Sequence, residues 1–156
     1  MPDDSLLSLL DIVRGKTLRI LADVTDEQAK FSAGLANHIL WHAGHILVVN
    51  ERLGVSVAAG AEPVLPPGWA DTFGPKSKPA TISKWPSLDD VLIKLRDQQT
   101  RFNTALLSVP DDRLGVIVND VRNWTLRQSV VYGLNDEAAH TGEIYLLKKL
   151  SGKTRV

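Results

Sequence analysis

Apolar side chains along most of the chain recur every three or four residues, which is the period of an amphipathic helix. The pattern predicts a first helix over Ser5–Val24 and, after a short turn at residues 25–27, a second helix that ends near Gly54. Ser32 and Asn37 are both candidate caps for the start of the second helix. The apolar stripe of the first helix consists of Leu6, Leu9, Leu10, Val13, Ile20, Leu21 and Val24.

Two further helices carry clearer start signals. Ser87 followed by Asp90 resembles a capping box, in which the two side chains bond each other's backbone N–H groups. The apolar stripe after this signal consists of Leu88, Val91, Leu92, Leu95, Phe102, Leu106 and Val109. Thr125 and Gln128 form a second capping-box pair, which predicts a fourth helix running to Leu150.

The segment 54–87, between the second and third helices, has a different composition. It holds six of the eight prolines and four glycines. Its aromatic residues Trp69, Phe73 and Trp85 favour burial, so we expect an ordered crossover over one end of the bundle, either a plain connection or a pocket wall. Four helices and one long crossover predict an all-α four-helix bundle, formed by residues 1–156 as a single domain.

Charge and cysteine content narrow the possible functions. The 156 residues include 18 basic and 18 acidic side chains, and this balance disfavours binding to nucleic acid or to an anionic membrane. Without cysteine there is no disulfide, no thiolate metal site and no cysteine nucleophile, so thiol chemistry would need an external thiol. The start of the chain lacks a signal-peptide pattern, and no apolar run approaches a membrane span; a cytoplasmic location is therefore expected.

Histidines and carboxylates are then the available metal ligands. His38, His42 and His45 lie along one side of the second helix, whereas His140 lies on the fourth helix, one turn after Asp136. Polar groups within a core stripe are costly unless they are paired or metal-bound. One divalent ion between the two helices, bound by one histidine of the second helix together with Asp136 and His140, would satisfy them. Three protein ligands leave a coordination position open for water or substrate. The alternative is a set of ordinary hydrogen-bonded core histidines.

Three stretches of the chain resemble a known family. Asn37–His45 resembles the second-helix signature of the DinB-like (YfiT-like) superfamily of metal-dependent enzymes. Asp136–Ile144 resembles its fourth-helix signature, in which a ligand, three residues, histidine, any residue and glycine precede an acid or amide. Pro66–Gly74 is similar to the crossover of one branch, and the likeness extends over nearly the whole chain.

The resemblance implies an up-down-down-up bundle and a metal ion at the floor of a pocket. It also implies a homodimer, which is frequent among family members. It assigns metal binding to His45 and His140, with Asp136 at the position where most members have a third histidine. Glu137 could compete with Asp136 as the ligand. Nickel or zinc is expected, and iron would also suit two histidines and a carboxylate.

Other residues near the expected ligands have open roles. His42 has two possible kinds of role. It faces the pocket, as a hydrogen-bond donor to a ligand or as a proton shuttle, or it is a bundle histidine that is hydrogen-bonded to the backbone or to water. His38 is expected near the helix start, in solvent or in a cap interaction. The candidate pocket residues are Trp41, Trp69 and Phe73, of which Trp41 would equally suit the core. Candidate hydrogen-bond partners of the ligands are Glu137 and Glu143, the latter alternatively paired with a nearby lysine.

Family members to which the chain is similar include thiol-dependent transferases and isomerases. The first hypothesis is therefore a divalent-metal-dependent enzyme that activates a low-molecular-weight thiol or water for transfer, isomerisation or hydrolysis of a small molecule. The second is a non-catalytic helical bundle, as a monomer or a dimer, in which a structural or vestigial metal site joins two helices.

Overall fold

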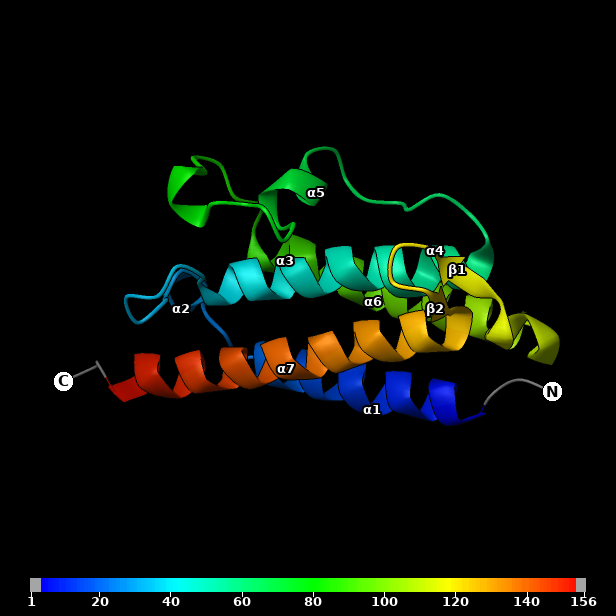
Figure 1. The fold of residues 1–156 in the computed structure, drawn as a ribbon. Coiled ribbons are helices and arrows are strands. Elements are labelled where there is room, and N and C mark those ends of the chain that lie inside the picture. Colours follow the sequence, from blue (N-terminus) through cyan, green and yellow to red (C-terminus); the bar gives the residue numbers. More distant parts are fainter. Residues whose placement is uncertain (1–3, 154–156) are drawn as a thin grey trace.

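The computed structural model describes residues 4–153, and four long helical segments dominate it (Figure 1). These segments are α1 (Asp4–Leu21), α3 (Ile39–Asn50) with its continuations η1 (Glu51–Val55) and α4 (Ser56–Ala59), α6 (Leu88–Leu107) and α7 (Leu126–Lys153). Figure 1 shows α1 and α7 running in one direction and α3 and α6 in the opposite one. The predicted up-down-down-up bundle is confirmed, with α1 and α3 each packed against both α6 and α7.

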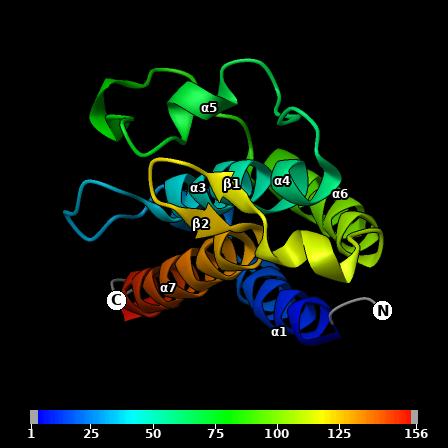
Figure 2. The same cartoon turned by 45° about the vertical axis from the view of Figure 1, so that its right-hand side comes forward.

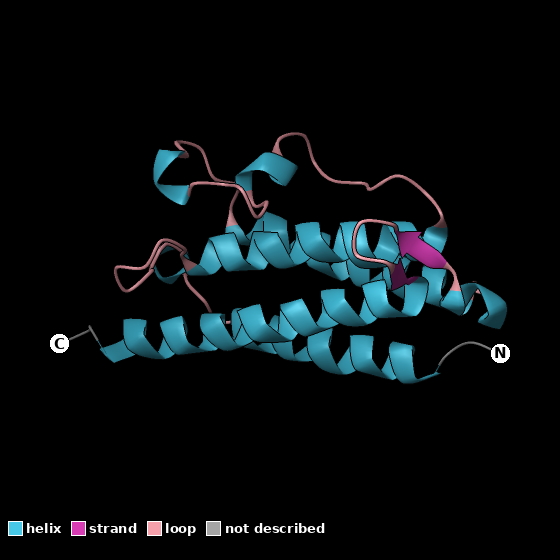
Figure 3. Ribbon diagram, in the orientation of Figure 1, coloured by secondary structure: helices cyan, strands magenta, loops and turns pink. Residues whose placement is uncertain are grey.

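Short elements lie at the ends of the bundle and in the crossover, which runs outside α3 (Figures 2 and 3). They are α2 (Asp26–Ala29), α5 (Trp69–Thr72), η2 (Pro79–Thr81), η3 (Asp111–Gly115), β1 (Ile117–Asn119) and β2 (Trp124–Thr125). The two strands pair antiparallel and lead directly into α7. This hairpin was not predicted, because strands of three and two residues are too short to show an alternating pattern.

Local helix-start signals are confirmed for α6 and α7. The backbone N–H of Asp90 donates to Ser87 Oγ at 3.0 Å, and the N–H of Gln128 donates to Thr125 Oγ1 at 3.2 Å. Neither Ser32 nor Asn37 caps α3, but the cap interaction expected as one alternative for His38 is confirmed. His38 is the N-cap, and its Nδ1 accepts from the backbone N–H of Trp41 at 3.0 Å.

Three helix ends differ from the prediction. The first helix stops at Leu21 rather than Val24, and α7 continues beyond Leu150 to Lys153. The second helix passes Gly54 through the π-turn of η1, in which Ser56 N–H bonds the carbonyl of Glu51, and it ends at Ala59. The glycine at position 54 is needed for packing, because a Cβ there would lie 2.3 Å from the Phe102 ring. The crossover therefore begins about six residues later than predicted.

The bundle interior consists of two apolar clusters with a polar layer between them. The polar layer is made of Arg14, Asn50, Gln98 and Glu137, one residue from each long helical segment, and all four are fully buried. Leu95 and Ile144 belong to the apolar cluster on one side of it, and Phe102 and Leu134 to the cluster on the other. No helix among residues 4–153 is both long and apolar enough to cross a membrane.

Candidate metal centre

The structure brings His45, Asp136 and His140 together; we call these three residues the inner cluster. His45 comes from α3, whereas Asp136 and His140 lie one turn apart on α7, which packs against α3. Their candidate ligand atoms all lie within 4.8 Å of one another. Asp136 Oδ2 is 3.7 Å from His45 Nε2 and 3.6 Å from His140 Nε2. These separations exceed ordinary hydrogen-bond lengths, so the atoms converge without bonding each other.

The Asp136 carboxylate is the least satisfied group of the inner cluster. Its Oδ2 is buried and has no hydrogen-bond partner within the described part of the chain. An unpaired buried carboxylate oxygen is costly, and a cation is what such an oxygen lacks. Two ligands at about 2.1 Å from a zinc ion and at a tetrahedral angle lie about 3.4 Å apart. The observed spacing is close to that value, so the residues present fit a divalent ion.

His45 is held with one ring nitrogen free to act as a ligand. Its Nδ1 lies 2.7 Å from the backbone carbonyl oxygen of Phe73. Because a carbonyl only accepts, Nδ1 carries the proton and donates it, and Nε2 keeps its lone pair toward Asp136. Burial lowers the pKa of His45, a shift that the Phe73 carbonyl opposes, so the ring is neutral at physiological pH.

The crossover reaches this histidine because of a close approach at Gly44. A Cβ at that position would lie 2.2 Å from the Phe73 ring, so only glycine lets the ring settle against α3. Phe73 is fully buried and supplies its backbone carbonyl to His45. Its side chain is part of the apolar core.

Trp41 covers the other side of His45. The two rings stack with centroids 4.5 Å apart and an interplanar angle of 15°, and Trp41 Nε1 donates to Ser77 Oγ at 2.6 Å. Trp69 packs edge-on against Phe73, with ring centroids 5.5 Å apart, so Phe73 lies between Trp69 and the inner cluster. Trp41 therefore adjoins the candidate ligands directly, and Trp69 supports them through Phe73.

A cavity of about 520 Å³ lies away from the inner cluster, against η1, α4 and α6.

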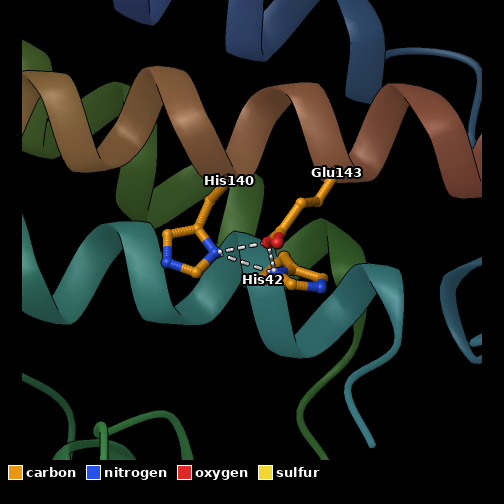
Figure 4. A group of neighbouring side chains, drawn as sticks. All are labelled: His42, His140 and Glu143. Atoms are coloured by element: carbon orange, nitrogen blue, oxygen red, sulfur yellow. Dashed lines mark hydrogen bonds and ion pairs between the residues drawn. The ribbon is translucent and has the colours of Figure 1, made fainter. Parts of the chain in front are cut away.

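A second group lies on the far side of the His140 ring; we call His42, His140 and Glu143 the outer cluster (Figure 4). The Nδ1 atoms of the two histidines are 2.9 Å apart, and each lies 3.1 Å from Glu143 Oε2. His42 is buried, which together with the nearby histidines lowers its pKa to about 3, so this ring is neutral. The side chain of Glu143 is 57% exposed, so the outer cluster opens to solvent.

Glu137 is not among the residues that gather here. Its carboxylate belongs to the polar layer, where Arg14 donates to both of its oxygens at 2.8 and 3.0 Å. Thr17 and Asn50 donate to it at 2.7 and 2.9 Å. Consecutive helix positions point about 100° apart, so Asp136 faces α3 and the cluster while Glu137 faces the interior. No lone pair of Glu137 is left for a metal shared with Asp136.

Arg14 is a residue that the sequence interpretation missed. It occupies a core-facing position of α1, four residues after Leu10, and it is fully buried. A charged residue on an apolar stripe is the signal that could have revealed a buried partner on another helix.

Comparison with known proteins places the fold and the family. A family model described as the DinB superfamily matches residues 9–144. The chain belongs to the DinB superfamily. A solved structure of this fold, described as the conserved protein of a locus from Enterococcus faecalis, is 16% identical, with a TM-score of 0.73. That match covers 96% of this chain and 97% of the other, and it supports the shared fold alone. No curated protein matches the chain.

Membership of the DinB superfamily agrees with the resemblance found in the sequence. The family match spans both helices that carry the inner cluster, from before His45 to beyond His140. The chain thus has a candidate site of histidines and carboxylates where α3 and α7 meet.

Proposed function

We propose that this DinB superfamily protein is a metal-dependent enzyme whose inner cluster holds a divalent ion, with nickel or zinc preferred and iron as a further candidate. The ion would supply Lewis-acid activation of a low-molecular-weight thiol or of water, for transfer, isomerisation or hydrolysis of a small molecule. The observation that carries the proposal is the buried Oδ2 of Asp136, which has no hydrogen-bond partner among the described residues and faces two imidazole nitrogens.

The surrounding residues support this role by fixing the ligands. Phe73 sets the tautomer of His45 by accepting from Nδ1, and Glu143 is the partner that can accept from Nδ1 of His140. Two neutral imidazoles and one carboxylate form a donor set suited to borderline divalent ions. The absence of cysteine from the sequence agrees with a thiol that comes from outside the chain.

One observation favours the second candidate, a site that joins helices without catalysis. The Trp41 ring is stacked on His45 and hydrogen-bonded to Ser77, and it shields one side of the inner cluster from an incoming molecule. In that case the ion would contribute stability alone, as structural zinc does.

Metal content tests the proposal first. Protein purified without a histidine tag is loaded with zinc or nickel, dialysed and measured by elemental mass spectrometry. We expect about one ion per chain in the wild type, and a clear loss in His45→Ala and in His140→Ala. His38→Asn is the matched control, since it removes a histidine of the same helix region and leaves an N-cap acceptor. A wild-type protein that takes up neither ion would overturn the proposal.

A spectroscopic experiment separates the enzyme from the structural site. The protein is loaded with cobalt, and its absorption is recorded while a low-molecular-weight thiol is added. A new sulfur-to-cobalt charge-transfer band, lost in Asp136→Asn, supports an open coordination position. A spectrum that does not respond to thiol, together with an unfolding free energy that depends on the metal, supports the structural alternative.

A further inference from the structure

The outer cluster offers a second, separate arrangement of ligand atoms. We propose that His42, His140 and Glu143 form a second position for a divalent cation, which uses Nδ1 of His140 while the inner cluster uses Nε2. The contacts among His42, His140 and Glu143 support this position, whatever chemistry the inner cluster carries out.

The spacing of the outer cluster fits a cation. Its three atoms, His42 Nδ1, His140 Nδ1 and Glu143 Oε2, form a nearly equilateral triangle with sides of 2.9, 3.1 and 3.1 Å (Figure 4). Two ligands at about 2.1 Å from an ion and at a right angle lie about 3.0 Å apart. The triangle therefore has the size of one face of an octahedral site, and solvent at the exposed Glu143 can fill the remaining positions.

Hydrogen bonds alone do not satisfy this triangle. If both Nδ1 atoms carry a proton, each can donate to Glu143, but the two N–H groups then face each other across 2.9 Å. If only one carries a proton, the other presents a lone pair to a carboxylate oxygen 3.1 Å away. As long as Glu143 is ionised, no placement of protons on the two Nδ1 atoms makes all three contacts favourable. A cation at the centre makes all three favourable at once.

The two positions compete for one ring. A neutral imidazole has a single lone pair, so His140 serves the inner position as one tautomer and the outer position as the other. When Nε2 binds an ion, the proton on Nδ1 can be accepted by Glu143; when Nδ1 binds it, the proton on Nε2 points to Asp136. We therefore expect one ion per chain, distributed between two positions, with weaker binding at the outer one because it is more exposed to solvent.

Zinc titration of the wild type and of blocked variants tests the second position. An inner-blocked variant carries His45→Gln and Asp136→Asn, and an outer-blocked variant carries His42→Gln and Glu143→Gln. Binding of Zn²⁺ is followed by competition with a chromophoric chelator, and folding is checked by circular dichroism. In this titration the inner-blocked variant is expected to keep about one zinc site per chain, of lower affinity than that of the wild type and therefore emptied by the dialysis step of the metal-content experiment. Adding Glu143→Gln to it is expected to weaken binding at least tenfold. Asp89→Asn, an exposed carboxylate at the start of α6, is the control for loss of a surface charge.

The nitrogen that binds distinguishes the two positions directly. In protein labelled with ¹⁵N-histidine and loaded with ¹¹³Cd, His140 is expected to coordinate through Nδ1 in the inner-blocked variant and through Nε2 in the outer-blocked one. The second position is overturned if the folded inner-blocked variant binds no zinc while the wild type does, or if Glu143→Gln leaves its affinity unchanged. Zinc held by the inner-blocked variant but not by the outer-blocked one would contradict the proposed function and leave the outer position standing.

Discussion

The polar layer and the inner cluster both place polar side chains between packed helices, but they differ in how those atoms are matched. In the polar layer, donors meet acceptors: Arg14 bonds Glu137, Gln98 and the carbonyl of Leu95. In the inner cluster, acceptors converge on one point and Asp136 Oδ2 has no partner among residues 4–153. A fully hydrogen-bonded network stabilises one packing of the helices. A buried carboxylate oxygen without a donor is costly, and a bound cation would remove that cost.

The contrast is sharpest between two consecutive residues of α7. Asp136 and Glu137 differ by one methylene group, yet within residues 4–153 Glu137 receives bonds from three side chains and Asp136 Oδ2 receives none. The polar layer has a small deficit of its own, since Asn50 Oδ1 is also buried without a partner. An amide oxygen carries no charge, however, and it costs less to leave unpaired than a carboxylate. Burial by itself therefore does not distinguish the candidate ligand Asp136 from Glu137; the missing donor does.

The largest expected effect comes from breaking the polar layer. Glu137→Gln leaves the Arg14 guanidinium buried beside a neutral partner, and loss of one member of a buried ion pair costs about 3–5 kcal/mol. The free energy of unfolding, measured by urea denaturation without metal, should fall by that amount. Asp136→Asn is the matched control, with an expected change of less than about 1 kcal/mol. Equal losses of unfolding free energy in the two variants would show that Glu137 is no more strongly stabilised by its partners than Asp136.

The same pair of variants should behave in the opposite way toward zinc. A ligand at one hundred times its dissociation constant stabilises the folded state by about 2.7 kcal/mol. Wild-type protein should gain an increment of this size when zinc is added, and Asp136→Asn should lose most of it at the same zinc concentration. The measurement is urea unfolding with and without zinc. An undiminished increment in Asp136→Asn would show that Asp136 is not a ligand.

A smaller effect is expected where the crossover meets the inner cluster. Gly44→Ala forces the Phe73 ring away from α3, and overpacking of this kind costs about 1–3 kcal/mol. The same change should weaken zinc binding, since the Phe73 carbonyl positions His45. Gly142→Ala is the control, because nothing lies within 4 Å of a Cβ there and alanine favours the helix by up to about 1 kcal/mol. Thermal unfolding and zinc affinity of both variants check this prediction.

The smallest effect concerns pH. Burial, reinforced by the charge of Lys30, lowers the pKa of His38 from 6.5 to about 4. Between these values the unfolded chain binds more protons than the folded one, so stability is complete above pH 6.5 and declines as the pH falls toward 4. His38→Asn keeps an N-cap acceptor without titrating. Because solvent partly screens the half-buried His38 ring, we expect the substitution to reduce the decline between pH 7 and 4.5 by roughly 1 kcal/mol, less than the full pKa difference would give. An unchanged decline in urea unfolding would contradict this contribution.

Much of the bundle was predictable because its signals are local. Apolar periodicity located the four long helices, and Ser87 and Thr125 marked two of their starts correctly. Asp136 and His140 were predictable neighbours, since residues four apart share one face of a helix. The end of the second helix was not, because its π-turn at Glu51–Val55 accompanies packing of Phe102 against Gly54, 48 residues apart in sequence.

The sequence by itself determined the helices, the available ligand types and the pairing of Asp136 with His140 on one helix. Only the tertiary structure decided what each histidine faces. Phe73, 28 residues away, fixes the tautomer of His45, and Glu143 and His42 meet on the other nitrogen of His140. Likewise Arg14 on α1 donates to Glu137, whereas Asp136 Oδ2 meets no donor within the described part of the chain. The physical reason is that hydrogen-bond matching depends on which atoms from distant segments arrive at one point, and neither periodicity nor spacing carries that information.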